Sequence, residues 1–236
     1  MISPSLLVMF DIDGTLTDTT RADEVCFVQA LRDVFGFTGI SMDWASYPHC
    51  TDSGILEELF QQRLGHSPLP AHISAFQSHF LSLLRAATAV QPFNPVPGAP
   101  VFISRLVRNA CHAISLASGA WECSARLKLA SAGFHLDQIP AAFADTAHAR
   151  EDIMRTSLTR AAQSRSQTSF NAVIYLGDGV WDARAARKLG YRFIGISRDP
   201  AKTDRLYAEG ASHVFPDYLN HTDCMLAIEQ MGQLPK

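Results

Sequence analysis

The sequence has 236 residues, a hydrophobic fraction of 47% and a formal net charge of −3. This length suits one large domain, or one core with an inserted cap, and the apolar content is ample for a sizeable core. Because no run of Lys or Arg occurs, we expect neither nucleic acid nor a membrane surface as the main partner.

The cysteines and the N-terminus point to a cytoplasmic protein. Five cysteines are scattered along the chain without a C-x-x-C pair, which predicts reduced, mostly buried thiols rather than disulfides or a zinc site. The first residues lack the basic segment of a secretory signal, and their apolar run leads directly into polar residues. We therefore expect a cytoplasmic protein with neither a signal peptide nor a transmembrane helix.

An apolar run at the start of the chain ends in two aspartates. Leu6 to Phe10 is predicted to be a strand buried on both faces, as in the interior of a parallel sheet. Asp11 and Asp13 follow it in the segment D-I-D-G-T-L-T, where Gly14 allows a tight turn. Two carboxylates this close repel each other unless a cation lies between them or one is protonated. A divalent cation, and chemistry with one ionised and one protonated carboxyl group, would suit this pair.

The next part of the sequence has helical spacing. Apolar residues recur at the helix period from residue 20 until Gly36, which ends the pattern. Two further helices are expected at Ile55–Leu64 and Ala71–Val90. A segment with four prolines follows, QPFNPVPGAP, and is typical of a semi-rigid linker. We therefore divide the chain into an α-helical cap, residues 19–96, and a core made of residues 1–18 and 97–236.

From residue 101 onward, helices and strands are predicted to alternate. The expected strands are 111–117, 141–144, 171–176, 192–196 and 213–215, and the expected helices are 101–109, 121–132, 150–162 and 182–189. Alternation of this kind implies a parallel sheet with right-handed crossovers. The predicted fold class is α/β, a Rossmann-like three-layer core with a parallel sheet, together with the small all-helical cap domain.

Polar residues follow three of the predicted strands, at the edge where the carboxyl ends of parallel strands meet. They are Asp11 with Asp13, then Ser118, and then Asp178. In its segments D-I-D-G-T-L-T, S-L-A-S-G and Y-L-G-D-G-V-W-D the chain resembles the first, second and fourth motifs of the haloacid dehalogenase-like superfamily of phosphohydrolases. The helical segment follows the first motif directly, as in the family's α-helical cap class.

The resemblance implies a role for each acidic residue. Asp11 would attack phosphorus and form an aspartyl-phosphate, and Asp13 would act first as general acid and then as general base. Magnesium is implied as cofactor, with the Asp11 carboxylate, the backbone carbonyl of Asp13 and Asp178 as ligands. Asp182 lies four residues beyond Asp178, where it could bind the metal through water or cap the helix that begins there.

The resemblance also implies a binding site for the phosphoryl group. Ser118 and Gly119 would form it with the free N–H groups of the following helix start. The family's third motif usually supplies a Lys, and here Arg150 stands in the expected place, with Arg155 one turn later in reserve. Lys128 is a poor candidate, because ten helical residues beyond Ser118 would place it about 15 Å away along the axis.

A second group of polar residues lies in the predicted cap. Thr51, Asp52 and Ser53 precede a glycine and a helix, which suits a loop that faces the active site and selects the substrate.

A magnesium-dependent phosphatase acting on a small phosphate ester is the function that these features favour. A metal-free dehalogenase is disfavoured because such family members lack the second acid that Asp13 supplies. A Schiff-base phosphonatase is disfavoured because the cap contains no lysine. A phosphoglucomutase-like transfer stays open, since it shares both aspartates. A non-catalytic protein of the same fold that binds phosphate or a partner is a further alternative, which only the Arg in the third motif supports.

Overall fold

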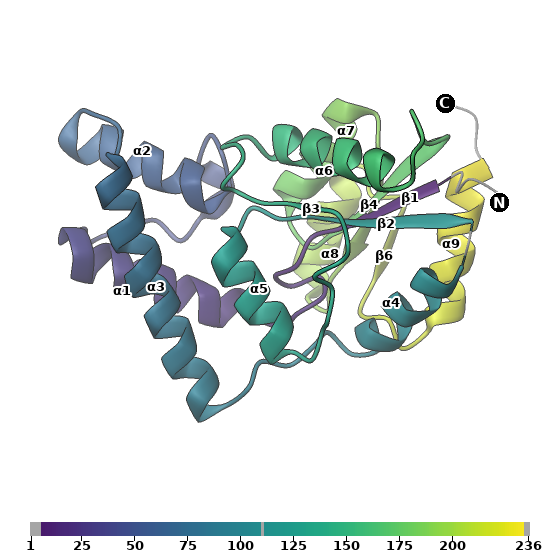
Figure 1. The fold of residues 1–236 in the computed structure, drawn as a ribbon, viewed down its shortest axis with the longest axis horizontal. Helices are drawn as coiled ribbons and strands as arrows, with labels where there is room; N and C mark the ends of the chain where they lie inside the picture. The colour runs from purple at the N-terminus through teal and green to yellow at the C-terminus, as the bar shows by residue number, and fades with distance from the viewer. Residues whose placement is uncertain (1–5, 110, 234–236) are drawn as a thin grey trace.

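The computed structural model describes residues 6–109 and 111–233. A six-stranded sheet with the order β3-β2-β1-β4-β5-β6 forms its centre (Figure 1). All neighbouring strands pair in parallel. The strands are β1 (Leu6–Phe10), β2 (His112–Ala117), β3 (Ala141–Ala142), β4 (Ala172–Gly177), β5 (Arg192–Ile196) and β6 (His213–Phe215). The predicted α/β class with a parallel sheet is therefore confirmed.

Helices cover both faces of the sheet, so the core has three layers. One face packs against α6 (Arg150–Ser164), α7 (Val180–Leu189) and α8 (Pro200–Ala208), and the other against α4 (Ala99–Arg108), α5 (Glu122–Ser131) and α9 (His221–Gln233). Alternate residues of β1 belong to the two cores: Leu7 and Met9 face the first, and Val8 and Phe10 face the second. This explains the unbroken apolar run, because every side chain of a central strand is buried.

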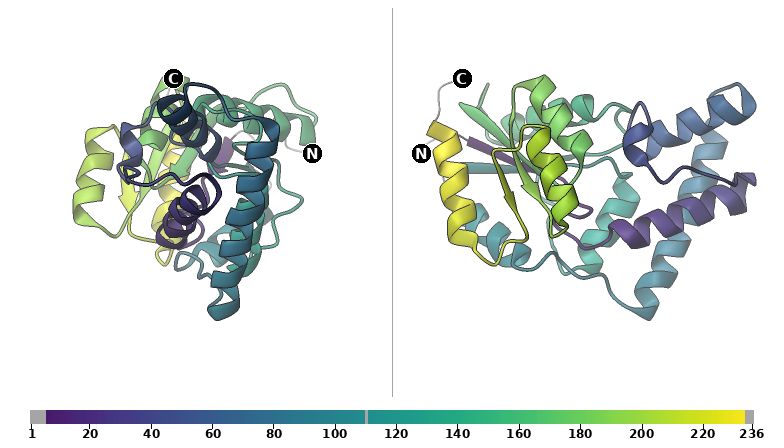
Figure 2. Two further views of the ribbon diagram at one scale, coloured as in Figure 1. Left: turned by 90° about the vertical axis from the view of Figure 1, so that its left-hand side faces the viewer. Right: turned by 180° about the vertical axis from the view of Figure 1, so that it is seen from behind.

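The remaining helices lie beyond the carboxyl ends of the strands (Figures 1 and 2). They are α1 (Thr20–Phe35), the short 3₁₀ helix η1 (Trp44–Ser46), α2 (Asp52–Leu64) and α3 (Pro70–Val90). The aromatic side chains of this segment pack against the start of α5, since Phe27 stacks on Trp121 with ring centroids 6.3 Å apart. The helical nature of this segment matches the sequence, and its assignment as a separate cap domain stays a prediction.

Most predicted elements lie within three residues of their expected ends, and the differences have local causes. Helix α2 begins at Asp52 rather than Ile55, because the Thr51 hydroxyl accepts a hydrogen bond from the Gly54 N–H at 3.1 Å and so caps the helix. Helices α8 and α9 were not predicted. Asp199 caps α8 through the Lys202 N–H and Pro200 occupies its first turn, a start signal that the sequence does contain.

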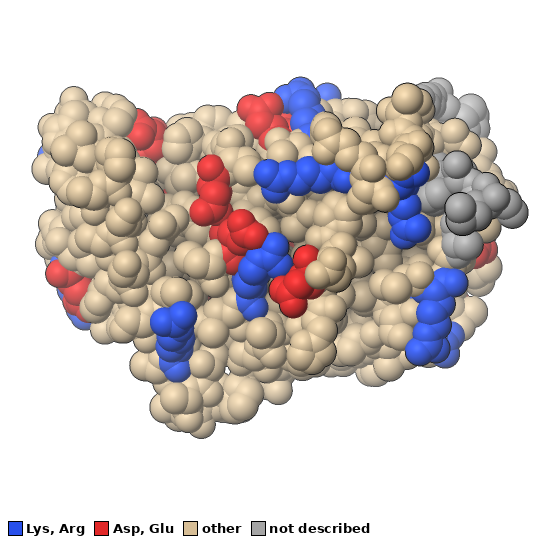
Figure 3. Space-filling view, viewed as in Figure 1, with Lys and Arg blue, Asp and Glu red and all other residues tan. Residues whose placement is uncertain are grey.

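The surface shows interspersed charges and fewer buried thiols than expected. On the face shown in Figure 3, basic and acidic side chains alternate without a continuous basic area. All five cysteines are free, but only Cys26 and Cys224 are buried, so the expectation of mostly buried thiols was wrong. Within the described ranges no helix has the length and apolar character needed to cross a membrane.

Candidate active site

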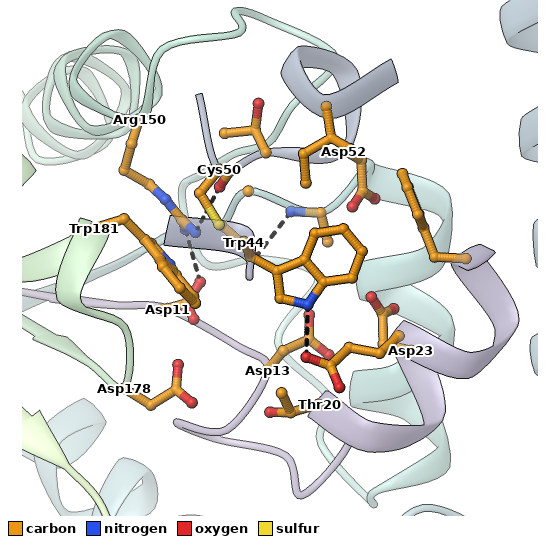
Figure 4. A pocket seen from close by; sticks show the side chains of 17 residues that line it. Asp11, Asp13, Thr20, Asp23, Trp44, Cys50, Asp52, Arg150, Asp178 and Trp181 are labelled. Carbon is orange, nitrogen blue, oxygen red and sulfur yellow. Dashed lines mark hydrogen bonds and ion pairs between the residues drawn. The ribbon is translucent and has the colours of Figure 1, made fainter. Parts of the chain in front are cut away.

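A cavity of about 100 Å³ lies between the carboxyl edge of the sheet and helices α1 and α2 (Figure 4). Most of the residues singled out in the sequence line it: Asp11, Asp13, Thr51, Asp52, Ser118, Gly119, Arg150 and Asp178. Ser53 and Asp182 do not line it, and the Ser53 hydroxyl instead donates to the Ala147 carbonyl at 3.5 Å. The structure thus brings together segments more than 100 residues apart.

Asp11 is buried at the end of β1, where its N–H donates to the Leu176 carbonyl at 2.9 Å. The Arg150 Nη1 donates to the Asp11 Oδ1 at 3.0 Å. Burial raises the pKa of Asp11 well above its ordinary value, and the nearby Asp182 carboxylate raises it further, while Arg150 acts in the opposite direction. The carboxyl group therefore lies where additional positive charge would favour its ionised form.

Arg150 is the first residue of α6 and is held in place from several sides. Its Nε lies 3.4 Å from the Asp182 Oδ1, and its Nη2 donates to the Cys50 carbonyl at 3.4 Å. Gly119 makes room for it, since a Cβ at that position would lie 2.7 Å from the Nη2 atom. The guanidinium group therefore stands beside the first-motif aspartate. Arg155 pairs instead with Asp152 at the surface.

Three buried carboxylates form the cluster best suited to a metal ion. Oxygen atoms of Asp11, Asp178 and Asp182 all lie within 4.8 Å of one another. Gly14 has a φ of +71°, and a Cβ there would lie 2.1 Å from the Asp178 Oδ2, so only glycine lets the loop pass so close. Several carboxylate oxygens in a small volume match the hard ligands that Mg²⁺ prefers.

Asp178 and Asp182 each have a second partner. Lys202, on α8, donates to the Asp178 carboxylate. The Asp182 Oδ2 accepts from the Gly179 N–H at 3.1 Å at the start of α7, so the predicted capping role of Asp182 is present. Burial raises the pKa of both carboxyl groups. Sequence reasoning missed Lys202 because the helix that carries it was not predicted.

Asp13 contacts a cation that the sequence analysis had rejected. Its carboxylate accepts from the Thr19 hydroxyl at 2.5 Å and from the Lys128 Nζ at 2.6 Å. Lys128 is fully buried on α5, and its Nζ also lies 2.6 Å from the Asp23 Oδ1 of α1. The sequence analysis considered only the distance from Lys128 to Ser118, whereas the Asp13 carboxylate lies beside Lys128 in the last turn of α5. Lys128 is thus a second cation at the site, in addition to Arg150.

The carboxylates around Lys128 share a low-dielectric environment. Burial raises the pKa of Asp23 to about 6, and Lys128 opposes that effect. Burial also raises the pKa of Asp52 well above its usual value, and the Asp23 charge adds to it. Although burial alone would lower the pKa of Lys128, the Asp13 and Asp23 carboxylates raise it. Lys128 therefore stays charged, which makes it unsuited to form a Schiff base.

The start of α5 is less open to an anion than the sequence predicts. The Trp121 N–H donates to the Asp52 Oδ2 at 2.9 Å, and the Glu122 N–H donates to the Asp145 Oδ2 at 2.6 Å. The Ser118 Oγ accepts from the Ala120 N–H at 3.3 Å. The expectation of free N–H groups was wrong at Trp121 and Glu122, because the Asp52 and Asp145 carboxylates already accept their hydrogen bonds.

Aromatic and acidic residues from α1 and η1 complete the cavity wall. Phe27, Glu24 and Trp44 line it, and the Trp44 Nε1 donates to the Glu24 Oε1 at 2.7 Å. Figure 4 shows the Trp44 ring on the same side of the cavity as Asp23. Trp181 also lines the cavity, whereas Trp121 lies in the core. The sequence analysis did not identify Trp44, since no predicted helix or motif includes it.

Comparisons with known proteins agree with this geometry. A family model described as haloacid dehalogenase-like hydrolase matches residues 6–190. None of the curated proteins compared with the sequence matches it.

Solved structures share the fold at low sequence identity. A hydrolase from Pseudomonas syringae has a TM-score of 0.70 and 19% identity, covering 92% of this chain and 98% of its own. A Bacteroides vulgatus protein, provisionally named a β-phosphoglucomutase, has a TM-score of 0.72 and 15% identity, covering 98% and 91%. A mutant of CbbY from Rhodobacter sphaeroides, solved with xylulose-1,5-bisphosphate, has a TM-score of 0.66 and 18% identity, covering 90% and 94%.

The family model spans most of the sequence, including the strands that carry Asp11, Ser118 and Asp178. These residues stand at the carboxyl ends of adjacent parallel strands, and each lines the same cavity. The chain belongs to the haloacid dehalogenase-like hydrolases.

Proposed function

We propose that this protein is a magnesium-dependent phosphatase that hydrolyses a small phosphate ester through a phosphorylated Asp11. The contact between Arg150 and Asp11 carries the proposal. It places a fixed cation beside the carboxylate that would accept the phosphoryl group, in the cavity that also holds Ser118. Because Arg pairs well with phosphoryl oxygens, Arg150 would take the place of the family's usual lysine.

Asp11 would act as the nucleophile. One of its carboxylate oxygens attacks phosphorus, and the bond from phosphorus to the ester oxygen breaks. Arg150 and the Ser118 hydroxyl would bind the phosphoryl oxygens during this step.

Asp13 would move the protons. In its protonated form it gives a proton to the leaving oxygen, and as a carboxylate it then accepts one from water. That water attacks phosphorus, the bond from phosphorus to Asp11 breaks, and inorganic phosphate leaves. The hydrogen bonds from Thr19 and Lys128 hold the Asp13 side chain in place for both steps.

The carboxylates of Asp11, Asp178 and Asp182, with the Asp13 carbonyl, would hold the magnesium ion, which would neutralise charge on the phosphoryl oxygens. The raised pKa values of the three carboxyl groups support this assignment. Even with Arg150 and Lys202 beside these groups, burial and mutual repulsion raise their pKa values, so a further cation would favour the ionised forms.

Hydrolysis of p-nitrophenyl phosphate with and without Mg²⁺ tests the proposal. We expect activity only with the metal, and a loss of about 10³-fold or more in kcat for Asp11→Asn, because the nucleophile is removed. Asp137→Asn, at a surface position with 76% side-chain exposure, is the matched control and should retain full activity.

Equal activity of the wild type and Asp11→Asn would refute the phosphatase proposal. A phosphoglucomutase-like enzyme would instead need a bisphosphate activator and would leave the phosphate on a product sugar. A non-catalytic phosphate-binding protein would bind phosphate in a calorimeter without turning over any ester.

A further inference from the structure

The part of the cavity beyond the phosphoryl site has an unusual charge balance. Six acidic residues line the cavity: Asp11, Asp13, Asp23, Glu24, Asp52 and Asp178. Arg150 is the one Lys or Arg among the described lining residues, and it is already directed at Asp11. No other lining cation is therefore available to pair with a second anionic group of a substrate.

The two lysines nearby do not change this balance. Lys128 is fully buried, is not among the lining residues, and is paired with Asp13 and Asp23. Lys202 is not among the lining residues either and is paired with Asp178. Even when both lysines are counted with Arg150, the six acidic side chains that line the cavity outnumber the three basic ones.

Arginines of the helical segment also point elsewhere. Arg32 pairs with Asp33 at the surface, and Arg63 donates to the Thr38 carbonyl at 2.6 Å. Arg21 and Arg85 are exposed and do not line the cavity. The helical segment, residues 19–96, contains no lysine. A substrate with a second phosphate or a carboxylate would therefore find no lysine or arginine side chain of the helical segment in the cavity lining.

The same wall offers two features that attract a cation. Glu24 is a carboxylate on the cavity wall, held by the Trp44 Nε1 at 2.7 Å. Trp44 and Phe27 also line the cavity there, with ring centroids 6.1 Å apart in an edge-to-face arrangement. A carboxylate together with aromatic rings is the usual arrangement for binding an ammonium group, through charge pairing and cation–π attraction. The cavity of about 100 Å³ admits only a small group.

We propose that the substrate is a small phosphate ester whose leaving group carries a positive charge, such as an aminoalkyl phosphate. The ammonium group would pair with the Glu24 carboxylate, next to the Trp44 and Phe27 side chains that line the same part of the cavity. This inference rests on the proposed phosphatase function and specifies its substrate class. A substrate of this class would differ from xylulose-1,5-bisphosphate, the compound with which the CbbY mutant was solved.

A series of three esters of nearly equal size isolates the charge of the leaving group. The esters are 2-aminoethyl phosphate, 2-hydroxyethyl phosphate and 2-phosphoglycolate, which carry a positive, a neutral and a negative group. At about pH 7.5 the amine is protonated. We expect kcat/KM for the amino ester to exceed that for the hydroxy ester about 10-fold, because one charge pair and one cation–π contact are gained. Phosphoglycolate should be the poorest substrate.

Glu24→Gln removes the charge and keeps the side-chain size. We expect it to reduce the ratio of kcat/KM between the amino and hydroxy esters about 10-fold. Glu58→Gln is the matched control, since Glu58 lies on α2 outside the cavity and accepts a hydrogen bond from the Gln62 Nε2 at 2.7 Å. It should leave the ratio unchanged. The proposal would be overturned by equal rates for the three esters or by a preference for phosphoglycolate. It would also be overturned if Glu24→Gln left the ratio of kcat/KM between the amino and hydroxy esters unchanged.

If no ester is hydrolysed, the phosphatase function is refuted, and a binding measurement then tests the charge preference separately. For this measurement the three esters would be titrated into the wild-type protein by calorimetry. Tighter binding of the amino ester, weakened by Glu24→Gln, would support the charge preference on its own. No binding, or equal binding of the three esters, would overturn it.

Discussion

Lys128 is the residue whose surroundings differ most from the sequence-based expectation. Its side chain is fully buried, and its Nζ contacts carboxylates on two different segments, the loop after β1 and helix α1. Replacing one member of a buried ion pair leaves the other charges without a partner. The two contacts therefore make Lys128 a structural link between the sheet and the helical segment.

Lys128→Met should lower the free energy of unfolding by about 3–5 kcal/mol, because Asp13 and Asp23 lose their common cation. Urea denaturation followed by circular dichroism measures this change. Lys188→Met is the control, since the Lys188 side chain is 71% exposed and its pair with Glu151 lies at the surface. A similar small loss in both variants would contradict the importance of the buried pair.

Gly14 and Gly36 form a second matched pair of residues. Both have a positive φ, +71° and +69°, but a Cβ at Gly14 would overlap Asp178, whereas a Cβ at Gly36 meets open space. Gly→Ala at either position should cost about 1–2 kcal/mol of stability from backbone strain.

Gly14→Ala should in addition lower kcat/KM about 10²-fold, because it displaces the Asp178 carboxylate from the candidate metal cluster. Steady-state assays of both variants at one protein concentration would show this. Equal activities for Gly14→Ala and Gly36→Ala would mean that the position of Asp178 is not critical.

At the scale of elements, the start of α2 connects the helical segment to the core. The Thr51 hydroxyl donates to the His148 carbonyl at 2.7 Å, just before α6. The Asp52 N–H donates to the Gly119 carbonyl at 2.7 Å. These bonds join α2 to the loop that carries Ser118 and to the loop that precedes Arg150, so this helix start helps to shape the cavity.

Thr51→Val should reduce the free energy of unfolding by about 1–3 kcal/mol, because it removes both the helix cap and the bond to the core. Thr88→Val is the control, since the Thr88 hydroxyl bonds the Arg85 carbonyl of its own helix at an exposed position. Chemical denaturation of both variants compares them. If the two losses are equal, the contact between α2 and the core adds little stability.

At the scale of the whole molecule, binding of Mg²⁺ should stabilise the fold. A ligand at 100 times its Kd adds about 2.7 kcal/mol, which for a chain of this size raises the Tm by roughly 5–10 °C. We expect differential scanning fluorimetry to show this shift with Mg²⁺ and its reversal by a chelator. Asp178→Asn should reduce the shift, while Asp137→Asn should not. An undiminished shift in Asp178→Asn would place the metal elsewhere.

The sequence by itself determined the α/β class, the order of most elements and the residues of the family motifs. These depend on short-range patterns: buried apolar runs for the strands, helical spacing for α1 to α7, and polar residues directly after strands. The convergence of Asp11, Ser118 and Asp178 follows from the parallel sheet alone, since its carboxyl ends share one edge. Arg150 could be placed because it lies at a helix start at the expected point along the chain.

Only the tertiary structure decided which groups surround those residues. Lys128 reaches Asp13 across 115 positions of sequence, and Trp121 meets Asp52 across 69. No local pattern encodes such contacts, because they depend on how the helical segment packs against α5 and the loops of the sheet. The aromatic and acidic wall formed by Glu24 and Trp44 arises in the same way. The motifs therefore identify the family and its acidic residues, and the packing of distant segments decides which other side chains line the cavity.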